Sequence, residues 1–133
     1  MKNVGLAHAT RLSLWAIMSV ASAAAGAAEP VSVQWTPDGR FEHQATIAPK
    51  QFLEVCDTIA SGARVAWKFS SDAALDFNVH FHEGTAVRYP VKIDAVRSEA
   101  GVFKPKKTAD YCWMWTNRGA QSASITLTLE QRR

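Results

Sequence analysis

Residues 63–70, ARVAWKFS, and residues 75–82, LDFNVHFH, place apolar side chains at every second position. Residues 123–130, ASITLTLE, repeat this alternation near the end of the chain. A period of two puts apolar side chains on one face of a β-strand and the remaining side chains on the other. The pattern is typical of antiparallel sheets with one face packed on a core and one face in water. These three runs therefore predict an all-β fold.

Shorter apolar segments between these runs predict weaker strands. They lie at residues 31–35, 45–47, 51–56 and 87–91. Pro90 marks the last of them as an edge strand or a bulge, because proline cannot donate a hydrogen bond to a neighbouring strand. Turn signals stand at residues 37–39, 61–62, 70–72, 83–84 and 117–119. Residues 72–75 could form one short helical turn. Seven or eight short strands in about 100 residues predict an antiparallel β-sandwich of the jelly-roll type.

The first 28 residues have the three parts of a secretory signal peptide. Lys2 and Arg11 supply positive charge, residues 12–20 are largely apolar, and small residues follow up to Ala28. The apolar run is too short to cross a bilayer, which needs about 20 residues. We therefore predict that residues 1–28 are cleaved and that no transmembrane segment remains. Residues 29–133 would then form one domain, periplasmic or secreted, in a bacterial envelope.

The charge balance gives no support for a nucleic-acid partner. The chain has 15 basic and 12 acidic residues, and 13 basic residues remain without Lys2 and Arg11, which leaves a net charge near +1. Binding to nucleic acid normally needs a clear basic excess. The loop lysines Lys104, Lys106 and Lys107 could contact an anionic headgroup or an acidic partner, or they could simply be solvated.

Cys56 and Cys112 are the only two cysteines in the chain. In an exported protein, two cysteines most simply form one disulfide. Closing a loop of about 57 residues would stabilise the fold by roughly 4 kcal/mol in the chain-entropy model. The alternative is that the two thiolates are soft ligands of a metal ion.

Several of these segments resemble a GOLD (Golgi dynamics) domain. The resemblance rests on residues 65–69 (VAWKF), 75–81 (LDFNVHF), 101–103 (GVF), 110–111 (DY), 116–117 (TN) and 124–129. It covers about residues 50 to 130. What it implies is a compact β-sandwich that is used for protein or lipid interaction. A fold resemblance alone does not establish a function.

Residues 78–83, NVHFHE, carry the most specific candidate for a metal site. On a strand, His80 and His82 point to the same face with Cα atoms about 6.5–7 Å apart, so they could share one ion. Such a pair is a recurring half-site for zinc or copper. The candidates for a third ligand are Asp76, Glu83, His43 and Met114. Met114 would favour copper, because thioether sulfur is a soft ligand. The alternative is that both histidines lie on a solvated face.

Residues 111–115, YCWMW, divide between two faces of a strand. One face carries Tyr111, Trp113 and Trp115, and the other carries Cys112 and Met114. If the cysteines point inward, the aromatic row faces outward and forms an interaction surface. In the opposite register the aromatic row is core, and Met114 turns toward the two histidines. Large aromatic side chains are more often buried, which favours the second register without excluding the first.

Catalytic signatures are missing from the sequence. It contains no Gly-x-Ser-x-Gly, no glycine-rich phosphate loop and no His-Glu-x-x-His, and the cysteines lack Cys-x-x-Cys spacing. We therefore predict a non-catalytic binding or interaction module of the cell envelope, with an envelope protein or a small ligand as its partner. No cofactor is required by any motif. The alternative is a periplasmic protein that handles copper or zinc through His80, His82 and Met114.

Overall fold

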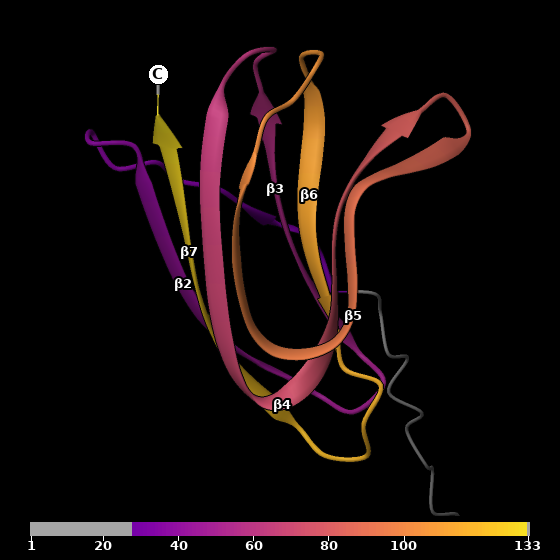
Figure 1. Ribbon diagram of the computed structural model, residues 1–133. Helices are drawn as coiled ribbons and strands as arrows, with labels where there is room; N and C mark the ends of the chain where they lie inside the picture. The colour runs from indigo at the N-terminus through magenta and orange to yellow at the C-terminus, as the bar shows by residue number, and fades with distance from the viewer. Residues whose placement is uncertain (1–27, 133) are drawn as a thin grey trace, which may run out of the picture.

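A U-shaped hairpin of two long strands organises the fold (Figure 1). In the computed structural model, which describes residues 28–132, β4 (Arg64–Glu83) runs for 20 residues and β5 (Ala86–Phe103) for 18. Both strands bend near their middle, where the pairing register shifts between Ser70 and Leu75. The expected turn and helical turn at residues 70–75 are therefore wrong. β7 continues to pair with Ser70 and Ser71, so the backbone hydrogen bonds persist into the bend.

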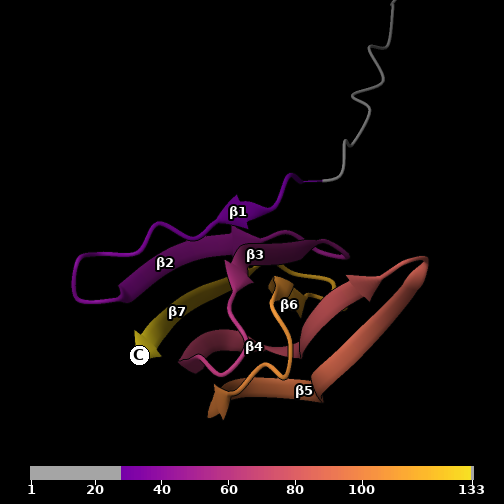
Figure 2. The ribbon, with the colours of Figure 1, turned by 90° about the horizontal axis from the view of Figure 1, so that it is seen from above.

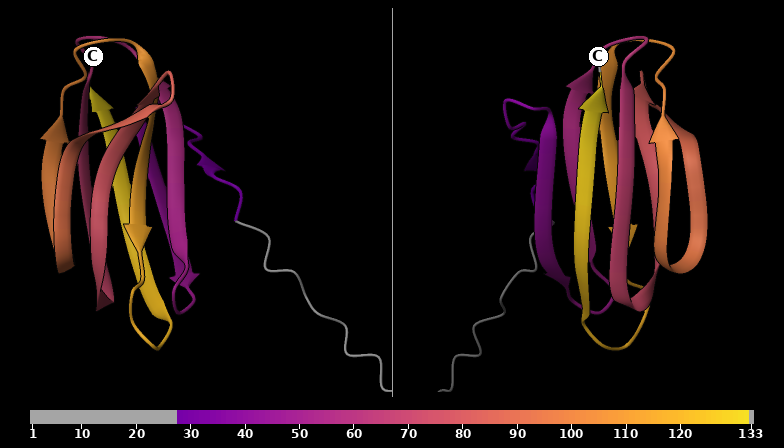
Figure 3. Two further views of the ribbon diagram at one scale, coloured as in Figure 1. Left: turned by 90° about the vertical axis from the view of Figure 1, so that its right-hand side faces the viewer. Right: turned by 60° about the vertical axis from the view of Figure 1, so that its left-hand side comes forward.

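The bent hairpin divides the sheet into two layers that face each other. The first layer contains β2 (Arg40–Ile47), β7 (Ala123–Arg132) and the first half of β4, and the second contains β1 (Val31–Ser32), β3 (Phe52–Ile59), β6 (Ala109–Thr116) and the second half of β4. The strand order is β1-β3-β6-β4-β7-β2, with β5 paired along β4. Figure 2 and Figure 3 show the layers from above and from the side. This arrangement confirms the predicted all-β sandwich, with β1 and β3 as a short parallel pair.

β5 is longer than the sequence indicated. It pairs only with β4 and is therefore an edge strand, and the register slips at Pro90, between the pairs Val79–Val91 and Phe81–Arg88. Pro90 thus lies both in an edge strand and at a bulge, the two alternatives that the sequence left open. Residues 92–103 escaped detection because an edge strand exposes most of its side chains, so no strong apolar alternation marks it.

Eight of the 19 buried hydrophobic residues within residues 28–132 are aromatic, and β4 and β6 supply six of these eight. Phe77 lies 5.2 Å from Trp115 and Phe69 lies 5.6 Å from Trp115, measured between ring centroids. The row Tyr111, Trp113 and Trp115 is only 2%, 0% and 1% exposed. The proposed interaction surface at these three residues is therefore wrong, and the buried register is confirmed. Burying three large aromatic rings stabilises the fold more than burying the two small cysteine side chains would, so the cysteines take the outer face.

The predicted signal peptide lies outside the described residues, apart from Ala28. Within residues 28–132, no helix is long and apolar enough to span a bilayer.

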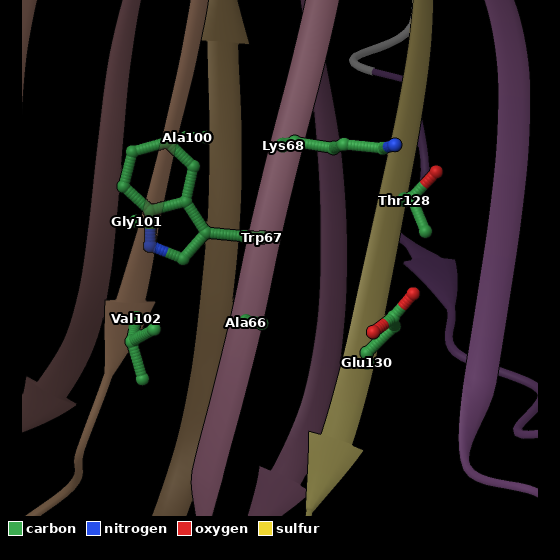
Figure 4. Close-up of a pocket in the computed structure, with 8 residues that line it drawn as sticks. All are labelled: Ala66, Trp67, Lys68, Ala100, Gly101, Val102, Thr128 and Glu130. Atoms are coloured by element: carbon green, nitrogen blue, oxygen red, sulfur yellow. The ribbon is translucent and has the colours of Figure 1, made fainter.

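Gly101 in β5 lies under the indole ring of Trp67, its pairing partner in β4 (Figure 4). A Cβ atom at Gly101 would approach Cζ2 of Trp67 to 2.6 Å. We expect Gly101→Ala to lower the free energy of unfolding by about 1–3 kcal/mol, because the buried indole must move. Urea denaturation measures this loss. The exposed neighbour provides the control, since Ala100→Val should change stability by less than about 0.5 kcal/mol. Equal stability of both variants would show that Trp67 is not held over the glycine.

Candidate functional site

The outer face of the second layer carries the residues predicted to bind metal. Because Trp113 and its aromatic neighbours point inward, Cys112 and Met114 of β6 point outward. Cys112 is bonded to Cys56 of β3, its partner in register, with Cα atoms 4.2 Å apart. The predicted disulfide is therefore confirmed, and it lies half-buried on the outside of the sheet.

His80 is buried beside this disulfide. It is 5% exposed, its Nε2 lies 3.0 Å from Oε1 of Glu54, and its Nδ1 lies 2.8 Å from Oδ1 of Asn78. Ligand atoms of Glu54, His80 and Cys112 all lie within 4.8 Å of one another. Sequence reasoning missed Glu54, because only the pairing of β3, β6 and β4 brings it to His80. The available signal was that Glu54 and Cys56 are two residues apart and so share a strand face.

The other predicted ligands are placed less favourably. His82 is exposed, with its ring centroid 5.7 Å from that of His80. Met114 shares the outer face, in register with Asn78 and Glu54. The remaining candidates are engaged elsewhere: Asp76 pairs with Arg118, Glu83 pairs with Lys107, and His43 lies on β2 in the first layer. The structure thus brings His80, His82 and Met114 onto one face.

The buried position of His80 determines its protonation. Burial lowers the pKa of His80 below its ordinary value, and the charge of His82 lowers it further, while Glu54 opposes both effects. A neutral imidazole has one N–H, so Asn78 and Glu54 compete for it. With the proton on Nδ1, His80 donates to Asn78 and turns an Nε2 lone pair toward Glu54. With the proton on Nε2 it donates to Glu54, and the Asn78 amide must turn to donate to Nδ1.

The lowered pKa of His80 predicts a loss of stability in acid. Below pH 6.5, the ordinary pKa of the side chain, the unfolded chain takes up a proton that the folded protein resists. The free energy of unfolding should therefore fall as the pH falls from 7.5 toward 5. Urea denaturation at several pH values measures this. His80→Gln should flatten the decline and His82→Gln should not. An unchanged slope in His80→Gln would contradict the assignment.

A cleft of about 700 Å³ lies between the tip of the β4–β5 hairpin and the β5–β6 loop. The hairpin tip extends away from the two layers in Figure 1 and Figure 2. Four aromatic residues line the cleft: Phe81, Tyr89, Phe103 and Tyr111. Tyr89 is 53% exposed, whereas Phe103 and Tyr111 are buried. The ring centroid of Tyr89 lies 5.9 Å from that of His80, on the side of the outer face, so the apolar floor of the cleft consists of Phe81, Phe103 and Tyr111.

Positive charge surrounds this aromatic floor. Lys107 Nζ lies 3.0 Å from Oε2 of Glu83 and 4.7 Å from the ring centroid of Phe81. Arg88 approaches the same carboxylate at 3.8 Å. The hydrogen bond from Lys107 lowers the pKa of Glu83, which keeps this pair ionised. Lys104 and Lys106 form no ion pair within residues 28–132. The cleft is therefore lined by one carboxylate, that of Glu83, and by four cations, those of Arg88 and the three loop lysines.

The sequence indicated that the three loop lysines either contact an anionic group or are simply solvated. Their association with Arg88 and Phe81 was not visible, because the hairpin meets the loop only in the folded chain. Tyr111 fixes the loop from below, since its hydroxyl donates to the Lys107 carbonyl at 2.9 Å. A basic cleft with an aromatic floor can hold an anionic group that is attached to an apolar body.

A second hollow of about 440 Å³ lies over β7, β4 and β5 (Figure 4). Small residues at Ala66, Ala100 and Gly101 create it. In Figure 4 the Lys68 side chain extends across β7 toward Thr128, and Glu130 lies further along the strand. One cation and one carboxylate leave this hollow without net charge. The cleft at the hairpin tip is therefore the stronger candidate for a binding site.

Comparison with known proteins reveals similarity at the level of fold. No protein-family model matches the chain, and no curated protein does. The solved structure of Aeromonas hydrophila PliG, a periplasmic lysozyme inhibitor of g-type lysozyme, aligns with a TM-score of 0.60 and 13% identity, covering 77% of this chain and 96% of PliG. Salmonella Typhimurium PliG aligns with a TM-score of 0.57 and 12% identity, covering 79% and 100%.

A protein of different description has the same architecture. The pre-peptidase C-terminal domain of collagenase from Bacillus anthracis aligns with a TM-score of 0.57 and 9% identity, covering 78% of this chain and 95% of that domain. At these identities the similarities show a β-sandwich-type fold and do not transfer a function. The narrower resemblance to GOLD domains stays a prediction.

Proposed function

We propose that this chain is an exported, non-catalytic binding protein of the bacterial envelope, periplasmic or secreted, with a GOLD-like sandwich as its scaffold. Its binding site is the cleft between the hairpin tip and the β5–β6 loop. The occupant is a carboxylate-bearing segment of a partner protein. The observation that carries this proposal is the excess of cations over an aromatic floor, with Glu83 as the only carboxylate among the described residues that line the cleft.

The chemistry of the cleft favours an acidic peptide segment. Exposed lysines at a rim attract carboxylates and select partners by charge, while aromatic rings supply most of the contact area. Val87 and Tyr89 are exposed at the hairpin, 38% and 53%, and extend the apolar contact beyond the cleft. A segment that combines acidic and aromatic side chains would satisfy both parts of the site.

The fold relatives support export and a protein partner. Two of them are periplasmic inhibitors of g-type lysozyme, and they are therefore proteins that act on another protein. A g-type lysozyme is accordingly the first purified partner to test. The confirmed disulfide also agrees with an oxidising compartment.

Nuclear magnetic resonance titration with short peptides tests the cleft. We expect Glu-Phe-Glu to shift the amide resonances of Arg88, Lys104 and Lys106, and Gln-Phe-Gln to shift them far less. Lys104→Glu/Lys106→Glu should weaken the binding about tenfold or more, because charge attraction becomes repulsion. The charge-matched control on the other layer, Arg64→Glu/Lys68→Glu, should bind like wild type. Shifts spread over the surface, or equal binding of both peptides, would refute the assignment.

Calorimetry with g-type lysozyme then addresses the identity of the partner. Binding that is lost in Lys104→Glu/Lys106→Glu would make lysozyme a partner through this cleft. Binding that the variant retains would place the lysozyme contact elsewhere.

A metal site at His80, His82 and Met114 is the second candidate function. It is favoured by the position of all three side chains on one outer face, with the two imidazoles 5.7 Å apart. Titration of the oxidised protein with Cu(I), Cu(II) and Zn(II) tests it. Tight binding lost in His80→Ala/His82→Ala would support a metal-handling protein, and equal binding by both proteins would remove that function.

A further inference from the structure

We propose that Glu54, Cys56, His80 and Cys112 form a thiol-dependent metal site. The site is blocked while the disulfide is intact and binds one Zn²⁺ ion once the disulfide is reduced. This inference does not rest on the hairpin cleft, and its ligand set differs from the predicted set of His80, His82 and Met114. It adds the two sulfurs and a carboxylate, and it omits His82.

The ligand atoms already lie at nearly the required spacing. Tetrahedral zinc binds nitrogen and oxygen at about 2.0–2.2 Å and sulfur at about 2.3 Å, so neighbouring ligand atoms are roughly 3.3–3.8 Å apart. Nε2 of His80 and Oε1 of Glu54 are 3.0 Å apart, and the atoms of Glu54, His80 and Cys112 lie within 4.8 Å of one another. Cys56 stands opposite Cys112 in register, so its thiolate would be the fourth ligand.

Asn78 prepares His80 for coordination. A histidine that binds a metal usually donates its other ring N–H to a neighbouring acceptor, which fixes the tautomer. Oδ1 of Asn78 lies 2.8 Å from Nδ1, and Asn78 is itself only 9% exposed. With the proton held on Nδ1, the Nε2 lone pair faces Glu54 and the sulfurs. A cation between Nε2 and the carboxylate would relieve the repulsion between these two acceptors.

The surroundings suit a site that opens on reduction. His80 is buried, whereas Cys56 and Cys112 are each half-buried on the outer face, within reach of an external thiol. A disulfide sulfur has no thiolate charge to offer a metal, and only the reduced form provides two anionic ligands. Two thiolates, one carboxylate and one neutral imidazole complete a four-coordinate set for zinc.

The reaction requires a two-electron reductant, which we take to be a dithiol. The dithiol gives two electrons and two protons to the Cys56–Cys112 bond and becomes a disulfide itself, while the protein acquires two thiols. Binding of Zn²⁺ then releases the two thiol protons as the Zn–S bonds form. Oxidation of the thiols by an external disulfide reverses both steps and expels the ion.

Cobalt and zinc titrations of the folded, exported chain test the inference. The oxidised protein and a phosphine-reduced, anaerobically desalted sample are titrated with Co²⁺, and Zn²⁺ then competes for the site. We expect a sulfur-to-cobalt charge-transfer band, one ion per chain, in the reduced sample alone, with zinc binding at least about 100-fold tighter than in the oxidised sample. Circular dichroism shows whether the reduced chain is folded before and after zinc.

Matched variants identify the ligands. His80→Ala and Glu54→Gln should each weaken binding by about tenfold or more, and His82→Ala should bind like wild type within about twofold. Cys56→Ser/Cys112→Ser should show no sulfur-to-cobalt band, with or without reductant. The inference fails if reduced and oxidised proteins bind zinc equally, if His82→Ala weakens binding as much as His80→Ala, or if the reduced chain is unfolded and zinc does not restore its fold.

Discussion

Replacing Trp113 with alanine is expected to lower the free energy of unfolding by about 3–5 kcal/mol. Trp113 is 0% exposed, at the centre of β6 between Tyr111 and Trp115. Its ring stands nearly perpendicular to that of Phe103, at a centroid distance of 6.1 Å. Truncation to alanine removes the apolar surface of the indole ring from the core and leaves a cavity between the two layers. Urea denaturation followed by far-UV circular dichroism measures the loss.

Two further variants make this prediction specific. Trp113→Phe should cost less than Trp113→Ala, because it keeps a ring and also removes an indole N–H that has no hydrogen-bond partner among residues 28–132. Tyr89→Ala removes an exposed aromatic side chain, so it should change stability by less than about 0.5 kcal/mol. If Trp113→Ala were as stable as Tyr89→Ala, the aromatic row would not be the core.

Reduction of the Cys56–Cys112 bond is expected to lower the free energy of unfolding by roughly 4 kcal/mol. The bond joins residues that are 56 apart in sequence, and without it the unfolded chain gains conformational entropy. For a domain of this size the midpoint of thermal unfolding should fall by roughly 15–30 °C. Thermal unfolding with and without a phosphine reductant measures this difference. Cys56→Ala/Cys112→Ala should show a similar loss that does not depend on reductant. A reduced protein that melts at the same temperature would contradict a stabilising role for the disulfide.

The sheet faces were predictable because alternation is a local property. Val65, Trp67 and Phe69 are all buried, as their spacing indicates, and so are Ile125, Leu127 and Leu129. The choice between the two faces of residues 111–115 followed from size alone, because Trp113 and Trp115 gain more from burial than Cys112 does. Both lines of reasoning use information within one strand.

Features that depend on pairing between distant segments were not predictable. Ser70 and Ser71 have the composition of a turn, yet both pair with β7, and Ser70 also pairs with β5, so the strand continues into the bend. Glu54 meets His80 only because β6 lies between β3 and β4. The hairpin cleft likewise needs the bend in β4, which carries the residues around Arg88 to the β5–β6 loop. No periodicity within one segment contains this information.

Photo-crosslinking in cells that make the protein tests the binding function of the cleft most directly. A photoreactive amino acid replaces Tyr89 at the rim of the cleft, or Ser98, an exposed residue of β5 that does not line the cleft. We predict that the Tyr89 position yields an adduct with one protein, that Lys104→Glu/Lys106→Glu abolishes this adduct, and that the Ser98 position yields none. No adduct from the Tyr89 position, or the same adduct from both positions, would contradict a partner-binding cleft at the hairpin tip.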